Sequence, residues 1–556
     1  MKKSGVQKLK IAIMAVHAAL TFLFSKMVFH TDAANPLGTI ALSDLYSDRL
    51  ERIVAYIFSE FTALVIIFCL WNLVFFLIKN FKKAYIPFGV LYVAGAIVIF
   101  ALWPEVFTSR FIHMHDNLAT YSSAIRLWPD YWHGFYQSIV YAGCMLVLPS
   151  SFMITLVQWS YFLYGVAYLF FRARVHSKKL CYLVLLVFAI PGAFDFATYA
   201  HRVCMYVCIL GIYVSVIIFD LIEKKDAGIA HYVMLGALGA FLSVWRSEGI
   251  VISSLLYLLL VIASCKKNIK KKIVRLLIFA GFFVVIYIPQ KMGDIKYYGK
   301  DYSIVNTFEA LSFIGNSAEC NLSYEEADDD LAAVSEVVPF DLIREKQAAG
   351  YRTYNFSVRG NYDINQSGVS KENASRYLDA YKNILLHNKK LYLEFKINTV
   401  CTALGFKTPF EKGSYDGPLS ELSDWHFYGW DNGYADYYTD SVMKWRQISV
   451  RERLTNKAFR IVKGYYNFFV DNGLYGTCII LLVCFNAFIA VSGIFVKKER
   501  ERTGGAYIGI SAVIALAFFA AVTVAMPEAW TIYYYAPCTA MIIVAFGYLI
   551  ARTKNG

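Results

Sequence analysis

The feature that most restricts this chain is a series of long apolar segments. Roughly ten segments of about 15–25 residues carry almost no charge, which is the length a helix needs to cross a hydrocarbon core of roughly 30 Å. Lipid offers no hydrogen-bond partners, so a spanning segment must satisfy its own backbone as a helix. With 58% apolar residues, the chain would expose too much apolar surface as a soluble domain. We therefore predict an all-α polytopic membrane protein with about twelve transmembrane helices.

The positive charges predict the orientation of these helices. The net charge is +13, and the lysines and arginines fall in short clusters between apolar segments, as at Lys79–Lys83, Arg172–Lys179, Lys266–Arg275 and Lys497–Arg502. Such clusters are typical of cytoplasmic loops. With both termini in the cytoplasm, every cluster lies on the cytoplasmic side. The charges do not form one basic face, so we expect membrane lipid as the partner and no nucleic acid.

The spans divide the chain into four parts. Residues 1–84 hold two spans, residues 85–289 a membrane core, residues 290–473 an extracytoplasmic domain, and residues 474–556 three more spans. Within the outer loop 104–151, the short apolar run Phe135–Leu148 is expected as an interfacial helix along the outer leaflet. The expected spans are Lys10–Phe29, Ile53–Ile78, Tyr85–Trp103, Phe152–Phe171, Leu180–Ala193, Val203–Ile222, Ile229–Trp245, Ile250–Ser264, Ile273–Ile288, Leu474–Val496, Ala506–Met526 and Trp530–Ile550.

Residues 290–473 have a different composition. They are rich in Asp, Glu, Asn, Ser and Tyr and contain no spanning run. Helix-like runs such as Asp328–Ala349 and Lys371–Leu393 predict a mostly helical domain. Its two cysteines are Cys320 and Cys401, and their spacing leaves open whether they form a disulfide.

The outer loop of the core carries the first candidate site residues. Asp116 is flanked by His113 and His115, and Arg126 and His133 follow before the apolar run. A carboxylate at the membrane surface can act as a general base, and neighbouring His or Arg side chains can bind phosphate. The alternative interpretation is a hydrated polar loop.

Two further outer turns carry charges beside the hydrocarbon. Asp195 and Arg202 lie between two apolar segments, and Arg246 and Glu248 lie in an R-S-E-G turn. Charges at this depth are costly unless paired or hydrated. They form either local pairs, with Asp195 capping a helix and Arg246 bound to Glu248, or one common site with the first loop.

The order of these features resembles the GT-C glycosyltransferase superfamily, which includes protein O-mannosyltransferases and lipid A aminoarabinose transferases. An outer loop with an acidic residue leads to W-x-H, an interfacial helix, a proline and a spanning helix. The sequence departs from that pattern in its two extra first helices and in its single loop aspartate. The residues that carry the resemblance are Asp116, Trp132, His133, Pro149, Gln158, Asp195, Arg246 and Tyr533–Pro537.

The resemblance implies a polyprenyl-phosphate sugar as donor, bound from the outer leaflet, with inversion at the sugar carbon. It implies Asp116 as the catalytic base, with Asp195 as the alternative, and Arg246 and Arg202 at the donor phosphate. The outer domain would then hold the acceptor. Its aromatic run with Trp425 and Trp430 suits stacking on sugar rings, or ordinary core packing.

Two other classes remain open from the sequence. An O-antigen-type polymerase or ligase also combines many spans with a large outer loop. A transporter or flippase is the other alternative, although no inverted repeat and no pair of broken helices is visible. No cofactor is predicted, apart from a divalent cation whose need is left open, because the chain lacks CxxC and zinc-ligand spacings.

Overall fold

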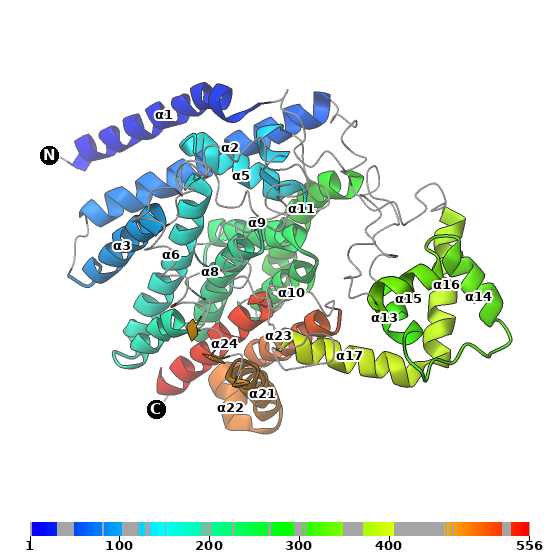
Figure 1. Ribbon diagram of the computed structural model, residues 1–556. Coiled ribbons are helices and arrows are strands. Elements are labelled where there is room, and N and C mark those ends of the chain that lie inside the picture. Colours follow the sequence, from blue (N-terminus) through cyan, green and yellow to red (C-terminus); the bar gives the residue numbers. More distant parts are fainter. Residues whose placement is uncertain are drawn as a thin grey trace.

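Every regular element that the structure describes is a helix. The elements run from α1 to α24 in chain order, with no strand among the described residues (Figure 1). This confirms the predicted all-α class for that part of the chain. The computed structural model describes residues 3–30, 49–79, 83–102, 120–121, 123–127, 134–150, 152–190, 193, 197, 202–224, 227–264, 268–293, 304, 307–348, 371–404, 461, 464–465, 468–469, 472–524 and 535–554.

Eight of the described helices are long and apolar enough to cross a membrane. Each coincides with one of the expected spans, which is the pattern of a multi-pass membrane protein. They are α1 (Lys3–Val28), α2 (Arg49–Lys79), α6 (Phe152–His176), α8 (Arg202–Ile222), α11 (Ile269–Gly293), α21 (Leu474–Phe495), α23 (Gly505–Val524) and α24 (Tyr535–Lys554).

The other four expected spans coincide with shorter apolar elements. These are α3 (Ile86–Leu102), α9 (Ile229–Trp245), α10 (Ser247–Ser264) and the 3-10 helix η3 (Leu180–Ala189). A helix of about 17 residues reaches roughly 26 Å, a few ångströms less than an average hydrocarbon core. The total of twelve spans therefore stays a prediction.

The element η3 differs in type from the α-helix expected there. Cys181 and Val184 are buried, and Val187 packs against the same core. These three residues repeat every third position. A helix with three residues per turn aligns them on one face, whereas an α-helix would spread them around its surface.

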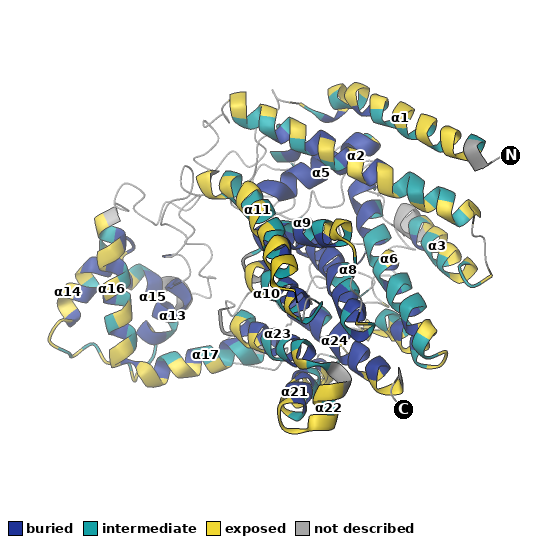
Figure 2. Cartoon of the chain, turned by 180° about the vertical axis from the view of Figure 1, so that it is seen from behind, coloured by how far each residue is buried: buried dark blue, intermediate teal, exposed yellow. Residues whose placement is uncertain are grey.

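The helix α5 (Phe135–Val147) corrects the expectation of an interfacial helix. All of its residues are buried, and it packs against α2, α1 and α6. An interfacial helix would expose its polar face to water. Figure 2 shows α5 and α8 as mostly buried helices, whereas α1 and α11 carry many exposed residues.

A glycine allows α5 to approach α2 closely. A Cβ atom at Gly143 would lie 2.7 Å from the Thr62 side chain and 3.0 Å from the Ser59 carbonyl oxygen. Such distances are shorter than normal van der Waals contact. The backbones can therefore meet here because position 143 has no side chain.

One imidazole connects α1 to α2 and α5. Trp71 Nε1 donates a hydrogen bond to His17 Nδ1 at 3.0 Å, and His17 Nε2 lies 2.9 Å from the Val147 carbonyl oxygen. Because an indole N–H can donate but not accept, Nδ1 must be the acceptor and Nε2 must carry the hydrogen. Both nitrogens of His17 are therefore hydrogen-bonded.

Five helices of the segment 290–473 form a unit with a hydrophobic core of its own. Tyr377 is fully buried in that core, and its hydroxyl lies 2.6 Å from the Thr307 hydroxyl. Burial raises the pKa of the Tyr377 phenol far above its usual range, so it remains a neutral hydrogen-bonding group. The helices are α13 (Phe308–Gly315), α14 (Ala327–Ser335), α15 (Phe340–Ala348), α16 (Lys371–His387) and α17 (Lys389–Ala403).

The last of these helices reaches back to the spanning helices. Figure 1 shows α13 to α16 apart from the bundle, and α17 packs against α23. At the corner between α16 and α17, Asn388 accepts a hydrogen bond from the Asn321 backbone N–H at 2.7 Å. The mostly helical character expected here is confirmed for the described residues. Its extracytoplasmic location stays a prediction.

We predict that Gly143→Ala destabilises the protein. The added methyl group would overlap Thr62 and press on the α2 backbone, and overpacking of this kind costs about 1–3 kcal/mol. The melting temperature in detergent should fall by several degrees. Gly281→Ala is the matched control, because nothing lies within 4 Å of its Cβ position and alanine favours a helix. An unchanged melting temperature for Gly143→Ala would contradict the close α2–α5 contact.

Candidate functional site

Two of the predicted site residues have described side chains, Arg126 and Arg246. Arg202 begins α8, but its side chain lies outside the described part. The structure therefore does not test whether the predicted residues meet in one site. Those that lie outside the described residues are Asp116, His113, His115, His133, Asp195, Trp425 and Trp430.

Arg246 forms the break between α9 and α10. Its backbone is extended, with φ −142° and ψ 149°, and its carbonyl oxygen accepts a hydrogen bond from the Gly249 N–H at 2.9 Å. A Cβ at Gly249 would lie 2.1 Å from the Leu242 carbonyl oxygen, so this position requires glycine. The extended backbone of Arg246 and the glycine at position 249 thus place the half-buried Arg246 side chain at the junction of two helices.

Arg126 lies near the beginning of α5. It is buried, with 7% of its surface exposed, and the neighbouring Leu127 packs with Phe135 and Tyr136. The Ile125 carbonyl oxygen accepts a hydrogen bond from the His30 N–H at 2.8 Å, just beyond α1. The chain segment of Arg126 is therefore attached both to α1 and to the first turn of α5.

The first turn of α5 also meets the Arg246 junction. Gln137 Nε2 lies 3.4 Å from the carbonyl oxygen of Trp245, the residue before Arg246. Gly134 precedes α5 with φ +110°, and a Cβ there would lie 2.9 Å from Gln137 Nε2. Glycine is thus required for this turn. The structure brings the chain at Arg126 and at Arg246 to the same end of α5.

Among the described residues, the neutral side chains at this end include three with a buried atom that has no hydrogen-bond partner. They are the Tyr136 hydroxyl, Gln137 Oε1 and the Trp245 indole N–H, on residues with at most 3% exposure. The ring of Phe241 lies between two of them, with centroid distances of 5.8 Å to Tyr136 and 5.0 Å to Trp245. We call these three residues the α5–α9 polar cluster.

Sequence analysis did not identify this cluster. Leaving a buried polar group unsatisfied costs about 1–3 kcal/mol, so unsatisfied groups in a folded protein need an explanation such as a bound molecule. The signal was present as the adjacent pair Tyr136–Gln137 at the start of an apolar run, but such neutral residues are common in membrane helices.

Sequence analysis also did not identify Glu60. It is buried within α2, with 7% of its surface exposed. Tyr56, one turn earlier, interacts with the Glu60 carboxylate and packs its ring against Phe29 beyond the end of α1. An acidic residue inside a spanning helix is rare and is often functional. Its signal was a lone acid in the expected span Ile53–Ile78.

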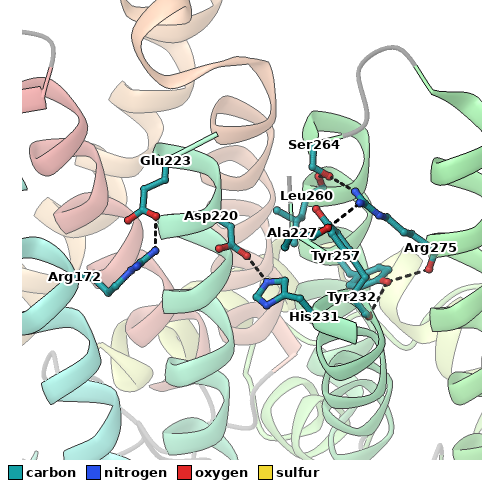
Figure 3. Close-up of polar contacts among 10 residues, drawn as sticks. All are labelled: Arg172, Asp220, Glu223, Ala227, His231, Tyr232, Tyr257, Leu260, Ser264 and Arg275. Atoms are coloured by element: carbon teal, nitrogen blue, oxygen red, sulfur yellow. Dashed lines mark hydrogen bonds and ion pairs between the residues drawn. The ribbon is translucent and has the colours of Figure 1, made fainter. Parts of the chain in front are cut away.

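The opposite end of α9 holds polar groups that are paired (Figure 3). Glu223 at the end of α8 accepts a hydrogen bond from Arg172 of α6. The Glu223 carboxylate also lies 3.4 Å from His176 Nε2. Asp220 Oδ2 lies 2.5 Å from Nε2 of His231 in α9. These contacts connect three helices at their predicted cytoplasmic ends.

Arg275 extends this network to α10 and α11 (Figure 3). Its guanidinium donates hydrogen bonds to the Ala227 carbonyl oxygen at 3.1 Å and to the Ser264 hydroxyl at 3.2 Å. It also lies 3.5 Å from the centroid of the Tyr232 ring. The Tyr257 hydroxyl lies within 3.1 Å of the Tyr232 and Arg275 carbonyl oxygens. A buried cation satisfied in this way stabilises the fold.

The two ends of α9 therefore differ in charge. The predicted cytoplasmic end holds several ion pairs, whereas at the predicted outer end Arg246 adjoins buried neutral polar groups. We identify the outer end, with the α5–α9 polar cluster and Arg246, as the candidate functional site. Among the described residues, no group of three His, Cys, Asp or Glu side chains is placed to hold a metal ion.

Comparison with protein-family models, curated proteins and solved structures finds no match to this chain. The functional argument therefore depends on its own residues.

We predict that Arg275→Ala lowers the melting temperature strongly. The substitution removes two charge-assisted hydrogen bonds and a cation–π contact in a buried position, which together contribute about 2–4 kcal/mol. Lys270→Ala is the control, because Lys270 is an exposed cation in the first turn of the same helix. Equal melting temperatures for the two variants would contradict a stabilising role of the network.

Proposed function

We propose that the protein is a membrane glycosyltransferase that moves a sugar from a polyprenyl-phosphate donor to an acceptor on the extracytoplasmic side. The observation that supports this proposal best is the group of buried neutral polar side chains beside Arg246 at one end of α9. Unsatisfied polar atoms and an arginine adjoin one end of an otherwise apolar bundle. A lipid-linked sugar presents the matching chemistry, with an apolar tail, one phosphate and a polar headgroup.

In this proposal Arg246 binds the donor phosphate. A guanidinium presents a planar set of donors that matches phosphate oxygens, and it remains charged at any physiological pH. The break between α9 and α10 holds the arginine beside Trp245. A donor lipid whose tail lies along the apolar helices would present its phosphate at the membrane boundary, where this arginine is predicted to lie.

Asp116 is the proposed base, with Asp195 as the alternative. The carboxylate accepts the proton of an acceptor hydroxyl, and the hydroxyl oxygen attacks the anomeric carbon of the sugar. A new carbon–oxygen bond forms on one face while the bond from the anomeric carbon to the phosphate oxygen breaks on the other. Polyprenyl phosphate leaves with that electron pair, and the configuration inverts.

A transporter or flippase is the second candidate, and Glu60 is the observation that favours it. Buried carboxylates in spanning helices line substrate and ion pathways in many transporters. A transporter would move a lipid or solute without forming a new bond. Detection of a glycosylated product that depends on this protein therefore separates the two candidates.

We predict that Arg246→Ala loses most of its bound lipid phosphate. A charge-assisted hydrogen bond contributes about 1.5–3 kcal/mol, so affinity should fall roughly tenfold or more. The measurement is the amount of polyprenyl phosphate that copurifies, determined by mass spectrometry. Arg174→Ala is the control, because Arg174 is an exposed arginine at the end of α6. Equal lipid retention by both variants would exclude the phosphate role of Arg246.

We predict that Asp116→Asn expresses and binds donor lipid but transfers no detectable sugar. Loss of a general base lowers a rate by about 10²–10⁴-fold. The measurement compares cell-envelope glycans of a deletion strain complemented with wild type, Asp116→Asn or Asp195→Asn. Activity of Asp116→Asn with loss in Asp195→Asn would assign the base to the second loop. Full activity of both variants would refute the proposed transfer mechanism.

A further inference from the structure

The α5–α9 polar cluster has a mixed hydrogen-bonding character. The Tyr136 hydroxyl can donate and accept, Gln137 Oε1 can accept, and Trp245 Nε1 can donate. All three atoms are buried and lack hydrogen-bond partners among the described residues. A ligand that satisfies them must offer both donors and acceptors. The hydroxyl groups of a sugar have this property, because each one can donate and accept.

The surroundings of the cluster are aromatic. Phe241 packs against both Tyr136 and Trp245, and Phe58 contacts the Tyr136 ring at 5.8 Å. Aromatic faces suit the C–H surface of a sugar ring. The Tyr hydroxyl and the Trp indole N–H can form hydrogen bonds with its hydroxyl groups. The cluster thus combines the two kinds of contact that a polyhydroxylated ring needs.

The cluster is also uncharged, and this restricts the ligand further. A carboxylate or ammonium group beside these three side chains would lose its hydration without gaining a counterion from them. The two arginines at this end of α5, Arg126 and Arg246, are assigned to the phosphate. We infer that the α5–α9 polar cluster binds a neutral sugar, the transferred group of the donor, and selects against charged sugars. This inference rests on the proposed function for its phosphate and lipid parts.

The test measures lipid binding by the full-length protein in nanodiscs. The probes are undecaprenyl phosphate alone, undecaprenyl phosphate carrying glucose, mannose or galactose, and its glucuronic acid counterpart. The variants are Tyr136→Phe and Trp245→Phe, which remove one hydrogen-bonding group each. Tyr141→Phe is the matched control, because it removes a hydroxyl from an equally buried tyrosine of the same helix.

We expect wild type to bind at least one neutral hexosyl lipid more tightly than the glucuronosyl lipid. Tyr136→Phe and Trp245→Phe should weaken that binding by about three- to tenfold, the effect of one hydrogen bond. Both should bind undecaprenyl phosphate like wild type. Tyr141→Phe should leave all affinities unchanged. Because the Tyr136 hydroxyl has no protein partner, Tyr136→Phe should keep the wild-type melting temperature without lipid.

Each contrary result has a separate meaning. Wild-type affinity of both variants for the neutral hexosyl lipids would overturn the sugar site while the phosphate role stands. Equal or tighter binding of the glucuronosyl lipid would overturn the preference for a neutral sugar. A melting temperature lowered by several degrees in Tyr136→Phe would show that its hydroxyl has a structural partner and overturn the inference. If wild type binds none of the lipids, the proposed function itself fails.

Discussion

Lipid hydrocarbon offers no hydrogen-bond partners, and this constraint orders the polar residues of the whole bundle. Where charges enter the bundle at one end of α9, they form ion pairs, and Arg275 donates two hydrogen bonds and lies over the Tyr232 ring. At the other end, Tyr136, Gln137 and Trp245 keep atoms without partners. Polar groups therefore enter the bundle at both ends, and the proposed function depends on the neutral ones beside Arg246.

The spanning helices were predictable because a segment that crosses the hydrocarbon core must be long and almost free of charge. The residues at which these helices begin and end were harder to predict. The first helix begins at Lys3 rather than Lys10, because backbone hydrogen bonding continues beyond the lipid, where hydropathy carries no signal. The location of α5 was not predictable. The run Phe135–Leu148 is short for a span, which suggested an interfacial helix, but packing against α2 buries every residue of α5.

Sequence analysis could identify the charged residues of the candidate site but not its neutral ones. Arg246 stood out because an arginine at a hydrocarbon boundary is costly. Tyr136, Gln137 and Trp245 did not, because what distinguishes them is burial without a partner, and burial is a property of the tertiary structure. Glu60 was overlooked because one acid barely changes the mean hydropathy of a long apolar run. The expected bases Asp116 and Asp195 lie outside the described residues and stay predictions.

The one-residue break at Arg246 has a consequence for how the protein is made. Helices α9 and α10 pack against each other, and a single residue connects them. Closing so short a connection costs little chain entropy, so the two helices can pair as soon as both have been synthesised. Each is short for a membrane span, yet as a pair they can enter the bilayer together. The residue proposed to bind the donor would thus be in position early in biogenesis, before the C-terminal helices complete the bundle.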